Sequence, residues 1–155
     1  MSQPIPEVYA LGLADDQVQM EKEWLDGFRK ATDSLDWAVW GNFWDDNAIL
    51  QFNNTRIEGK DKIGQHFEGQ FKLLKLMKHT TTRVSIVEPP GLIYQNSTVS
   101  YKVSGDSSDR TIDIPGLAII HKRSGAKVLT KFETYIDTEP LVSIIKEVVG
   151  GNQSH

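Results

Sequence analysis

The chain has 155 residues, enough for one ordinary domain with a single hydrophobic core. Its 39% hydrophobic and 25% charged residues exclude a disordered or fibrous protein, and its net charge of −4, with both signs interspersed, argues against a nucleic-acid partner. It has no cysteine, which excludes disulfides, thiolate catalysis and cysteine-ligated metals, and no apolar run of the roughly 18–20 residues that a membrane span needs. Because the N-terminus also lacks a secretory signal, we expect a cytoplasmic protein without a membrane partner.

The first third of the chain predicts an arm and two helices. Residues 1–14 carry two prolines and little periodicity, and we interpret them as an arm over the surface or onto a partner. A first helix is predicted from Asp15, since acids favour a helix N-terminus and apolar residues then recur at helical spacing, namely Met20, Trp24, Phe28 and Ala31. A second, shorter helix after residues 33–34 carries Trp37, Trp40 and Trp44. The tryptophans are expected in the core or along a ligand cavity.

The rest of the chain passes from one more helix to a series of strands. A short strand over 48–52 and a turn precede a third helix, predicted from about Lys60 to Leu76. Strands rich in Thr, Val, Ile and Tyr are then predicted, separated by residues that turns prefer, over 79–87, 92–104, 110–122 and 127–137. A final helix opens at Thr138 and ends at the glycine pair 150–151. We therefore expect one domain over residues 15–149 and a disordered tail over 150–155.

This order of elements defines the fold class. Helices followed by hairpin-connected strands predict an α+β fold with a mixed or antiparallel sheet. About three N-terminal helices wrap this sheet, which we expect to curve strongly into a cone, and a C-terminal helix completes the fold. Because the helices can fill the concave face only in part, a pocket should remain there.

Several segments carry a resemblance to a known family, namely Phe43–Leu50, Glu58–Ile63, Asp113–Leu117, Gly125 and Glu133–Asp137. They resemble the nuclear transport factor 2-like superfamily, in its SnoaL-like branch of small polyketide cyclases. The resemblance covers roughly residues 15–148. It implies a cone-shaped barrel with a hydrophobic pocket and, as is common in this fold, a homodimer. Members include isomerases, dehydratases, epoxide hydrolases, cyclases and pure binding proteins, so the resemblance does not define one reaction.

The last predicted hairpin has two unlike faces, because side chains alternate along a strand. One face is apolar and consists of Ile112, Ile114, Ala118, Ile120, Phe132 and Ile136. The other mixes apolar residues with Asp113, Lys131, Glu133 and Tyr135. In one arrangement the apolar face packs on the helices and the mixed face lies in solvent. In the other, the mixed face lines the pocket, as the resemblance to ketosteroid isomerases implies for Lys131 and Tyr135, and a second subunit covers the apolar face.

The second arrangement would make the mixed face catalytic. Asp113 and Tyr135 would be neighbours in the pocket, with Glu133 and Lys131 along the same wall. A carboxyl group in an apolar pocket can act as general acid or base near neutral pH, and a phenol beside it can stabilise an oxyanion. In the first arrangement Asp113 is a solvated strand residue or the partner of a nearby cation.

His79 is a further candidate for proton transfer. It opens the first long predicted strand, where scytalone dehydratase, by resemblance, also has a catalytic histidine. A neutral imidazole there can take or give a proton. The alternative is a histidine that caps the negative end of the third helix. No two histidines have a metal-ligand spacing on one helix, and we expect neither a metal nor a cofactor.

At one position the chain departs from the ketosteroid isomerases. Their catalytic base ends the first strand, where this chain has Phe52. Asn54 shares the parity of Phe52 along the strand, so it is expected to point into the pocket as a hydrogen-bonding group. The apolar walls of the pocket are expected from Trp40, Phe52, Phe67 and Phe71.

The sequence thus predicts a cofactor-independent isomerase, dehydratase or cyclase of secondary metabolism. It would act by acid–base proton transfer on a hydrophobic, polyketide- or terpenoid-like small molecule. The alternative is a non-catalytic binding or adaptor protein of the same fold, which needs the apolar walls but not the proton-transfer groups. A third possibility is a protein-interaction module that uses the outer face of the sheet.

Overall fold

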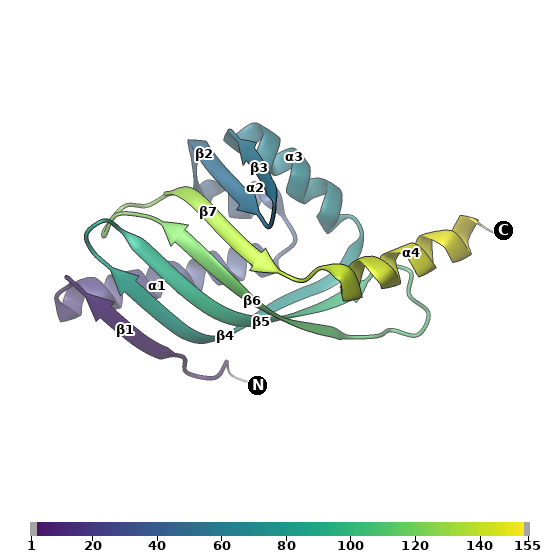
Figure 1. Ribbon diagram of the computed structural model, residues 1–155, viewed down its shortest axis with the longest axis horizontal. Coiled ribbons are helices and arrows are strands. Elements are labelled where there is room, and N and C mark those ends of the chain that lie inside the picture. The colour runs from purple at the N-terminus through teal and green to yellow at the C-terminus, as the bar shows by residue number, and fades with distance from the viewer. Residues whose placement is uncertain (1–2, 154–155) are drawn as a thin grey trace.

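In the computed structural model, which describes residues 3–153, one curved sheet is wrapped by helices (Figure 1). The strands are β1 (Glu7–Leu11), β2 (Trp44–Phe52), β3 (Thr55–Glu58), β4 (Leu74–Val87), β5 (Leu92–Val103), β6 (Ile112–His121) and β7 (Leu129–Ile136). The helices are α1 (Asp15–Asp33), α2 (Trp37–Trp40), α3 (Lys60–Phe71) and α4 (Glu139–Gln153), and a short 3₁₀ turn, Gly41–Phe43, follows α2. The expected α+β fold is confirmed.

The sheet is mixed, with the strand order β1-β4-β5-β6-β7-β2-β3. Its centre, from β4 to β7, is an antiparallel meander, whereas β1 pairs with β4 and β2 pairs with β7 in parallel. Helix α1 lies behind the sheet in Figure 1, α2, α3 and β3 gather at one end, and α4 extends away at the other. The sheet therefore has one face turned toward helices, the inner face, and an outer face without a helix over it.

The core begins at one wholly apolar row across the inner face. Cross-strand pairing aligns Ile86, Ile93, Ile120, Phe132 and Leu50, each at most 8% exposed. An aromatic cluster from the helices packs against this row. It includes the ring of Trp40, 4.6 Å from that of Phe67 and 5.3 Å from that of Trp44. Aromatic side chains bury large areas each, so this cluster supplies much of the apolar stabilisation at the helical end.

Several expected boundaries are wrong. The third helix ends at Phe71 and not at Leu76, and β4 begins at Leu74, so His79 lies inside the strand. A register irregularity between Leu74 and Leu76 places Leu74 and Met77 on the buried side, which mimics the spacing of a helix. Trp44 belongs to β2 and not to the second helix.

The two ends of the chain also differ from expectation. Part of the expected arm is strand β1, which pairs along β4 from Glu7 opposite Arg83 to Leu11 opposite Val87. Helix α4 continues through the glycine pair to Gln153, so residues 150–153 are helical and not a disordered tail. The remainder of that expected tail, residues 154–155, lies outside the described residues. No helix in the described part of the chain is long and apolar enough to cross a membrane.

Candidate functional site

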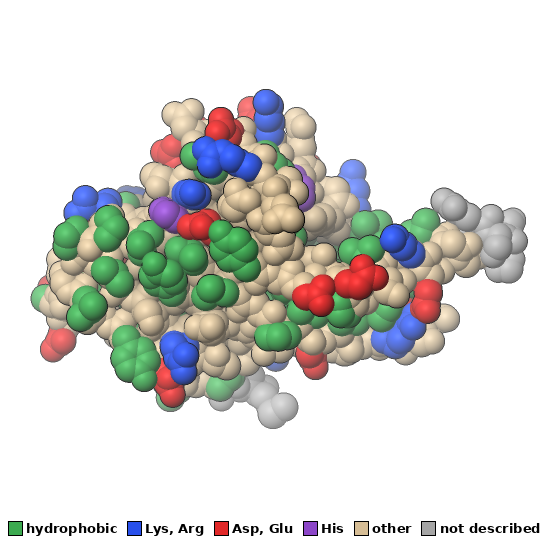
Figure 2. Space-filling model, in the orientation of Figure 1, with side chains coloured by type: hydrophobic (Ala, Val, Ile, Leu, Met, Phe, Trp, Pro, Cys, Tyr) green, Lys and Arg blue, Asp and Glu red, His purple; other side chains and the backbone are tan. Residues whose placement is uncertain are grey.

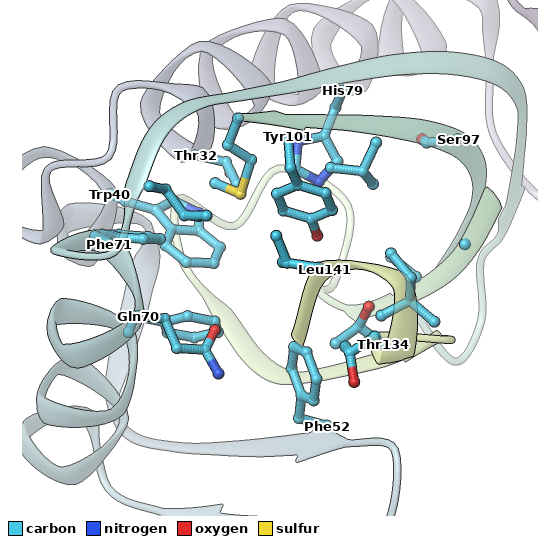
Figure 3. Close-up of a pocket in the computed structure, with 18 of the residues that line it drawn as sticks. Thr32, Trp40, Phe52, Gln70, Phe71, His79, Ser97, Tyr101, Thr134 and Leu141 are labelled. Atoms are coloured by element: carbon cyan, nitrogen blue, oxygen red, sulfur yellow. The ribbon is translucent and has the colours of Figure 1, made fainter. Parts of the chain in front are cut away.

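A cavity of about 350 Å³ lies between the inner face of the sheet and helices α1, α3 and α4 (Figure 3). Most of its lining is aromatic or aliphatic. The polar members of the lining are Arg29, Thr32, Gln70, His79, Thr81, Gln95, Ser97, Tyr101, Thr134 and Thr138. This volume falls near the lower end of the range of about 300–1,000 Å³ that is typical of small-molecule pockets.

The cavity exists because the sheet carries small residues beside its apolar row. One cross-strand row consists of Thr81, Ser97, Gly116 and Ile136, and the next contains Gln95, Ala118, Thr134 and Phe52. Gly116 leaves space in the middle of the floor, where an added Cβ would stand 3.4 Å from the side chain of Ile136. Over the apolar row, the Ile and Phe side chains fill the space between the sheet and the helices. Over the rows that contain Gly, Ala and Ser, the side chains are too short to fill it, and the cavity remains.

A histidine in the wall of this cavity is paired with a carboxylate. The Nδ1 atom of His79, which lines the cavity, lies 2.6 Å from Oδ1 of Asp33 at the end of α1. The backbone N–H of His79 also donates to both carboxylate oxygens of Asp33, at 3.2 and 3.1 Å. In the tautomer that donates Nδ1–H to this carboxylate, Nε2 of the imidazole is left as an acceptor.

Tyr101 provides a phenol next to this pair. Its hydroxyl points into the cavity, with the imidazole of His79 at its side (Figure 3). The residue is 8% exposed, and burial, followed by the negative charge of Asp33, raises the pKa of Tyr101 to about 12. Among the described residues no side chain or backbone group hydrogen-bonds to this hydroxyl, so it remains neutral and free to donate to a ligand.

Sequence reasoning missed two of these three groups. Asp33 lies at the predicted break between the first two helices, and its partner follows 46 residues later in the chain, a separation that no local pattern connects. Tyr101 had a usable signal, because it alternates with the buried Val99 and Val103 and therefore belongs to the inner face.

The four aromatic residues expected as cavity walls are found there, whereas the polar residue expected to point into the cavity is not. Trp40, Phe52, Phe67 and Phe71 all line the cavity. Asn54 is exposed in the turn between β2 and β3 and does not line it, so its expected role is wrong. A turn at this point changes the direction of the chain, and alternation along β2 does not extend through it. The neighbouring Asn53 instead exchanges two hydrogen bonds with the backbone of Ile136, at 2.8 and 3.0 Å.

The expected catalytic hairpin faces the other way. Asp113, Lys131, Glu133 and Tyr135 lie on the outer face, and none of them lines the cavity. The apolar set expected beneath a second subunit points inward, with Ile112, Ile114, Ile120, Phe132 and Ile136 each at most 9% exposed. Of the two arrangements left open by the sequence, the structure has the one in which the apolar face packs on the helices. The physical reason is that this face alone can bury β-branched and aromatic side chains without burying charges.

The outer polar groups form their own network. Nε2 of His121 lies 2.6 Å from Glu133, and the Tyr135 hydroxyl donates to the other carboxylate oxygen at 2.7 Å. Burial acts to raise the pKa of Glu133, but the hydrogen bonds from His121 and Tyr135 outweigh it and lower that pKa below its ordinary value. These groups satisfy one another and leave little for a ligand.

A second polar pair borders the cavity on α3. Nε2 of His66 lies 3.2 Å from the amide nitrogen of Gln70, which lines the cavity, and burial lowers the pKa of His66. The imidazole is therefore neutral at physiological pH and orients Gln70. No group of three or more potential metal ligands occurs in the described part of the chain.

No protein-family model and no curated protein matches the chain in sequence. Solved structures do resemble it. A protein assigned to the SnoaL-like polyketide cyclases from Shewanella denitrificans OS-217 is 14% identical with a TM-score of 0.66, covering 83% of this chain and 98% of that one. A protein assigned as an isomerase from Bacillus subtilis is 22% identical with a TM-score of 0.65, covering 87% and 96%.

A nuclear transport factor 2-like protein of unknown function from Cytophaga hutchinsonii is 14% identical, with a TM-score of 0.56 over 78% of this chain and 93% of that one. At such identities the likeness concerns the fold. The chain has the nuclear transport factor 2-like fold, as the resemblance of its segments implied.

Proposed function

We propose that the protein is a cofactor-independent enzyme of the SnoaL-like type that moves a proton on a hydrophobic small molecule. The observation that carries this proposal is His79, which lines an apolar cavity and pairs with Asp33 outside the lining, beside the Tyr101 hydroxyl, which has no hydrogen-bond partner among the described residues. Isomerisation, dehydration and aldol-type cyclisation all begin with such a transfer next to a carbonyl group.

The three groups have separate roles. His79 is the acid–base residue, since Nε2 can accept a proton from a carbon next to a carbonyl and return it elsewhere. Asp33 orients the ring through the hydrogen bond at Nδ1, accepts two more from the backbone N–H of His79, and stabilises the imidazolium that forms. Tyr101 donates to the carbonyl oxygen as negative charge develops on it, in a site where the low local polarity strengthens that interaction.

The aromatic side chains that line the cavity indicate the substrate class. Trp40, Phe67 and Phe71 present aromatic surface to the cavity, which favours an aromatic or polycyclic ligand over a sugar or a nucleotide. The similar structures assigned to polyketide cyclases and to an isomerase support the same chemistry. Secondary metabolism is the setting in which such substrates occur.

A non-catalytic carrier is the second candidate, because the lining is mainly apolar and would hold a ligand without proton transfer. The test is to incubate small-molecule extracts of the source organism with the wild-type protein and with His79→Asn, and to compare them by mass spectrometry. A product that appears only with the wild type supports the enzyme; a mass loss of one water indicates dehydration, and an unchanged mass indicates isomerisation or cyclisation. A compound retained unchanged by both proteins supports the carrier.

The expected homodimer remains a proposal, now on the opposite face of the sheet. Apolar side chains gather over the outer face, among them Leu117 and Ile119 beside the exposed Tyr135 (Figure 2). The same face carries both signs of charge, with Lys131 next to Glu133, so two copies related by a twofold axis can pair opposite charges. Sedimentation at micromolar concentration should show a dimer that Ile119→Asp dissociates; a monomeric wild type would contradict it.

A further inference from the structure

The charged residues that line the cavity differ from those of the protein as a whole. The chain is acidic, with a net charge of −4, but no aspartate, glutamate or lysine belongs to the cavity lining found among the described residues. Arg29 is the one lining residue there with a permanent charge. From this we infer that the ligand carries a carboxylate, held by Arg29, in addition to the group that reacts at His79.

The guanidinium of Arg29 is positioned for this task. Its Nη2 donates to Oδ1 of Asp26 at 2.8 Å, and its side chain is 20% exposed. The hydrogen bonds among the described residues use only this one of its three nitrogens. A planar guanidinium with free donors is the group that binds a carboxylate in two parallel hydrogen bonds.

The contact with Asp26 does not cancel this positive charge. The second carboxylate oxygen of Asp26 pairs with Lys30 at 2.9 Å, and Asp26 is 52% exposed to solvent. Hydrogen bonds from Lys30 and then from Arg29 lower the pKa of Asp26, so it stays ionised and is shared between two cations. The cluster of three therefore has a net positive charge, and Arg29 is its member on the cavity side.

Helix α1 also places Arg29 near the proposed reacting groups. Arg29 and Asp33 are four residues apart on this helix, so their backbone positions are about 6 Å, or one helical turn, apart along its axis. The ligand class is an apolar, mostly aromatic carboxylic acid whose reactive carbon is a few bonds from the carboxylate. This inference rests on the proposed function only in taking the cavity as the ligand site.

The test uses two probes of nearly the same shape, 2-naphthoate and its neutral amide, 2-naphthamide, titrated by calorimetry against the full chain. We expect the wild type to prefer naphthoate and Arg29→Gln to bind naphthoate about 10–100-fold more weakly, with the amide changed less than about twofold. The matched control is Lys30→Gln, which removes the other cation paired with Asp26 but does not line the cavity. It should leave the amide affinity nearly unchanged and weaken naphthoate binding far less than Arg29→Gln does, because the guanidinium donors remain.

Three results would overturn the inference: equal affinity for the two probes, equal losses in Arg29→Gln and Lys30→Gln, or no binding of either probe. Arg29→Lys, which keeps the charge without the planar fork, should recover part of the naphthoate affinity and so separates charge from a folding defect. His79→Asn should retain the preference for naphthoate. A preserved preference without any turnover in the extract experiment would refute the catalytic proposal and leave the carboxylate site standing.

Discussion

Two histidine–carboxylate pairs of the same length lie on opposite faces of the sheet. Asp33 and His79 are 2.6 Å apart on the inner side, and Glu133 and His121 are 2.6 Å apart on the outer side. Each pair also has a tyrosine beside it. Judged by residue types and distances alone, both are candidate acid–base sites.

The surroundings separate them. The inner tyrosine, Tyr101, is 8% exposed and has a free hydroxyl in a cavity, whereas the outer one, Tyr135, is 40% exposed and donates to Glu133. A network whose donors and acceptors satisfy one another has none left for a substrate. An acid–base group becomes catalytic when its free atom faces an enclosed space that a ligand can fill. Enclosure therefore distinguishes these pairs better than their geometry does.

The largest expected effect on turnover comes from substituting the two histidines in separate single variants. His79→Asn should lower turnover of the identified substrate by about 10²–10⁴-fold, because it removes the acid–base group. His121→Asn should change turnover less than about twofold, and both are measured as kcat/KM. Comparable losses in the two variants would show that the outer pair belongs to the active site after all.

A buried ion pair between Lys122 and Glu21 extends the comparison to the stability of the fold. Nζ of Lys122 lies 2.5 Å from Glu21, with side-chain exposures of 0% and 3%, and also stands 4.9 Å from the centre of the Trp24 ring. Glu21→Gln leaves the lysine buried without its counter-charge, so the free energy of unfolding in urea should fall by about 3–5 kcal/mol.

The control is the double variant Glu21→Leu with Lys122→Met, which removes both charges and should recover most of that loss. Turnover per folded molecule should be unchanged in all of these variants, since neither residue lines the cavity. A loss in the double variant as large as in Glu21→Gln would mean that packing, and not the charge, is responsible.

The two tyrosines offer a matched pair of single-atom changes. Tyr101→Phe should lower kcat by about 10²–10³-fold, because it removes the only donor proposed for the oxyanion. Tyr135→Phe should leave kcat unaffected. If Tyr101→Phe raised only KM, the hydroxyl would bind the substrate without stabilising the transition state.

The smallest expected effect is the pH dependence of the outer network. Glu133 has a lowered pKa in the folded protein, so its contribution is present above its ordinary pKa of 4.5 and is lost as the pH falls through the folded value. Glu133→Gln should therefore destabilise the protein at pH 7 by less than about 1 kcal/mol, and the difference should shrink below about pH 4.5. Urea unfolding at several pH values measures it, with Asp113→Asn as a control on the same face. A difference that grew toward acid pH would contradict the assigned network.

The sequence by itself determined the fold class, the alternation of the last hairpin and the aromatic walls. Those features depend on local periodicity, since a helix repeats every 3.6 residues and a strand every two. The spacing of Phe67 and Phe71, for example, already placed both on one side of a helix.

Only the tertiary structure decided which face of the hairpin points inward. Both faces carry apolar residues, and the row of Ile120 and Phe132 was covered by helices that a single hairpin does not reveal. It also decided the histidine–carboxylate pair at the cavity, because Asp33 and His79 meet through the docking of α1 on β4 and not through any shared motif. Alternation assigns residues to faces, but only packing against the rest of the chain assigns a face to the inside.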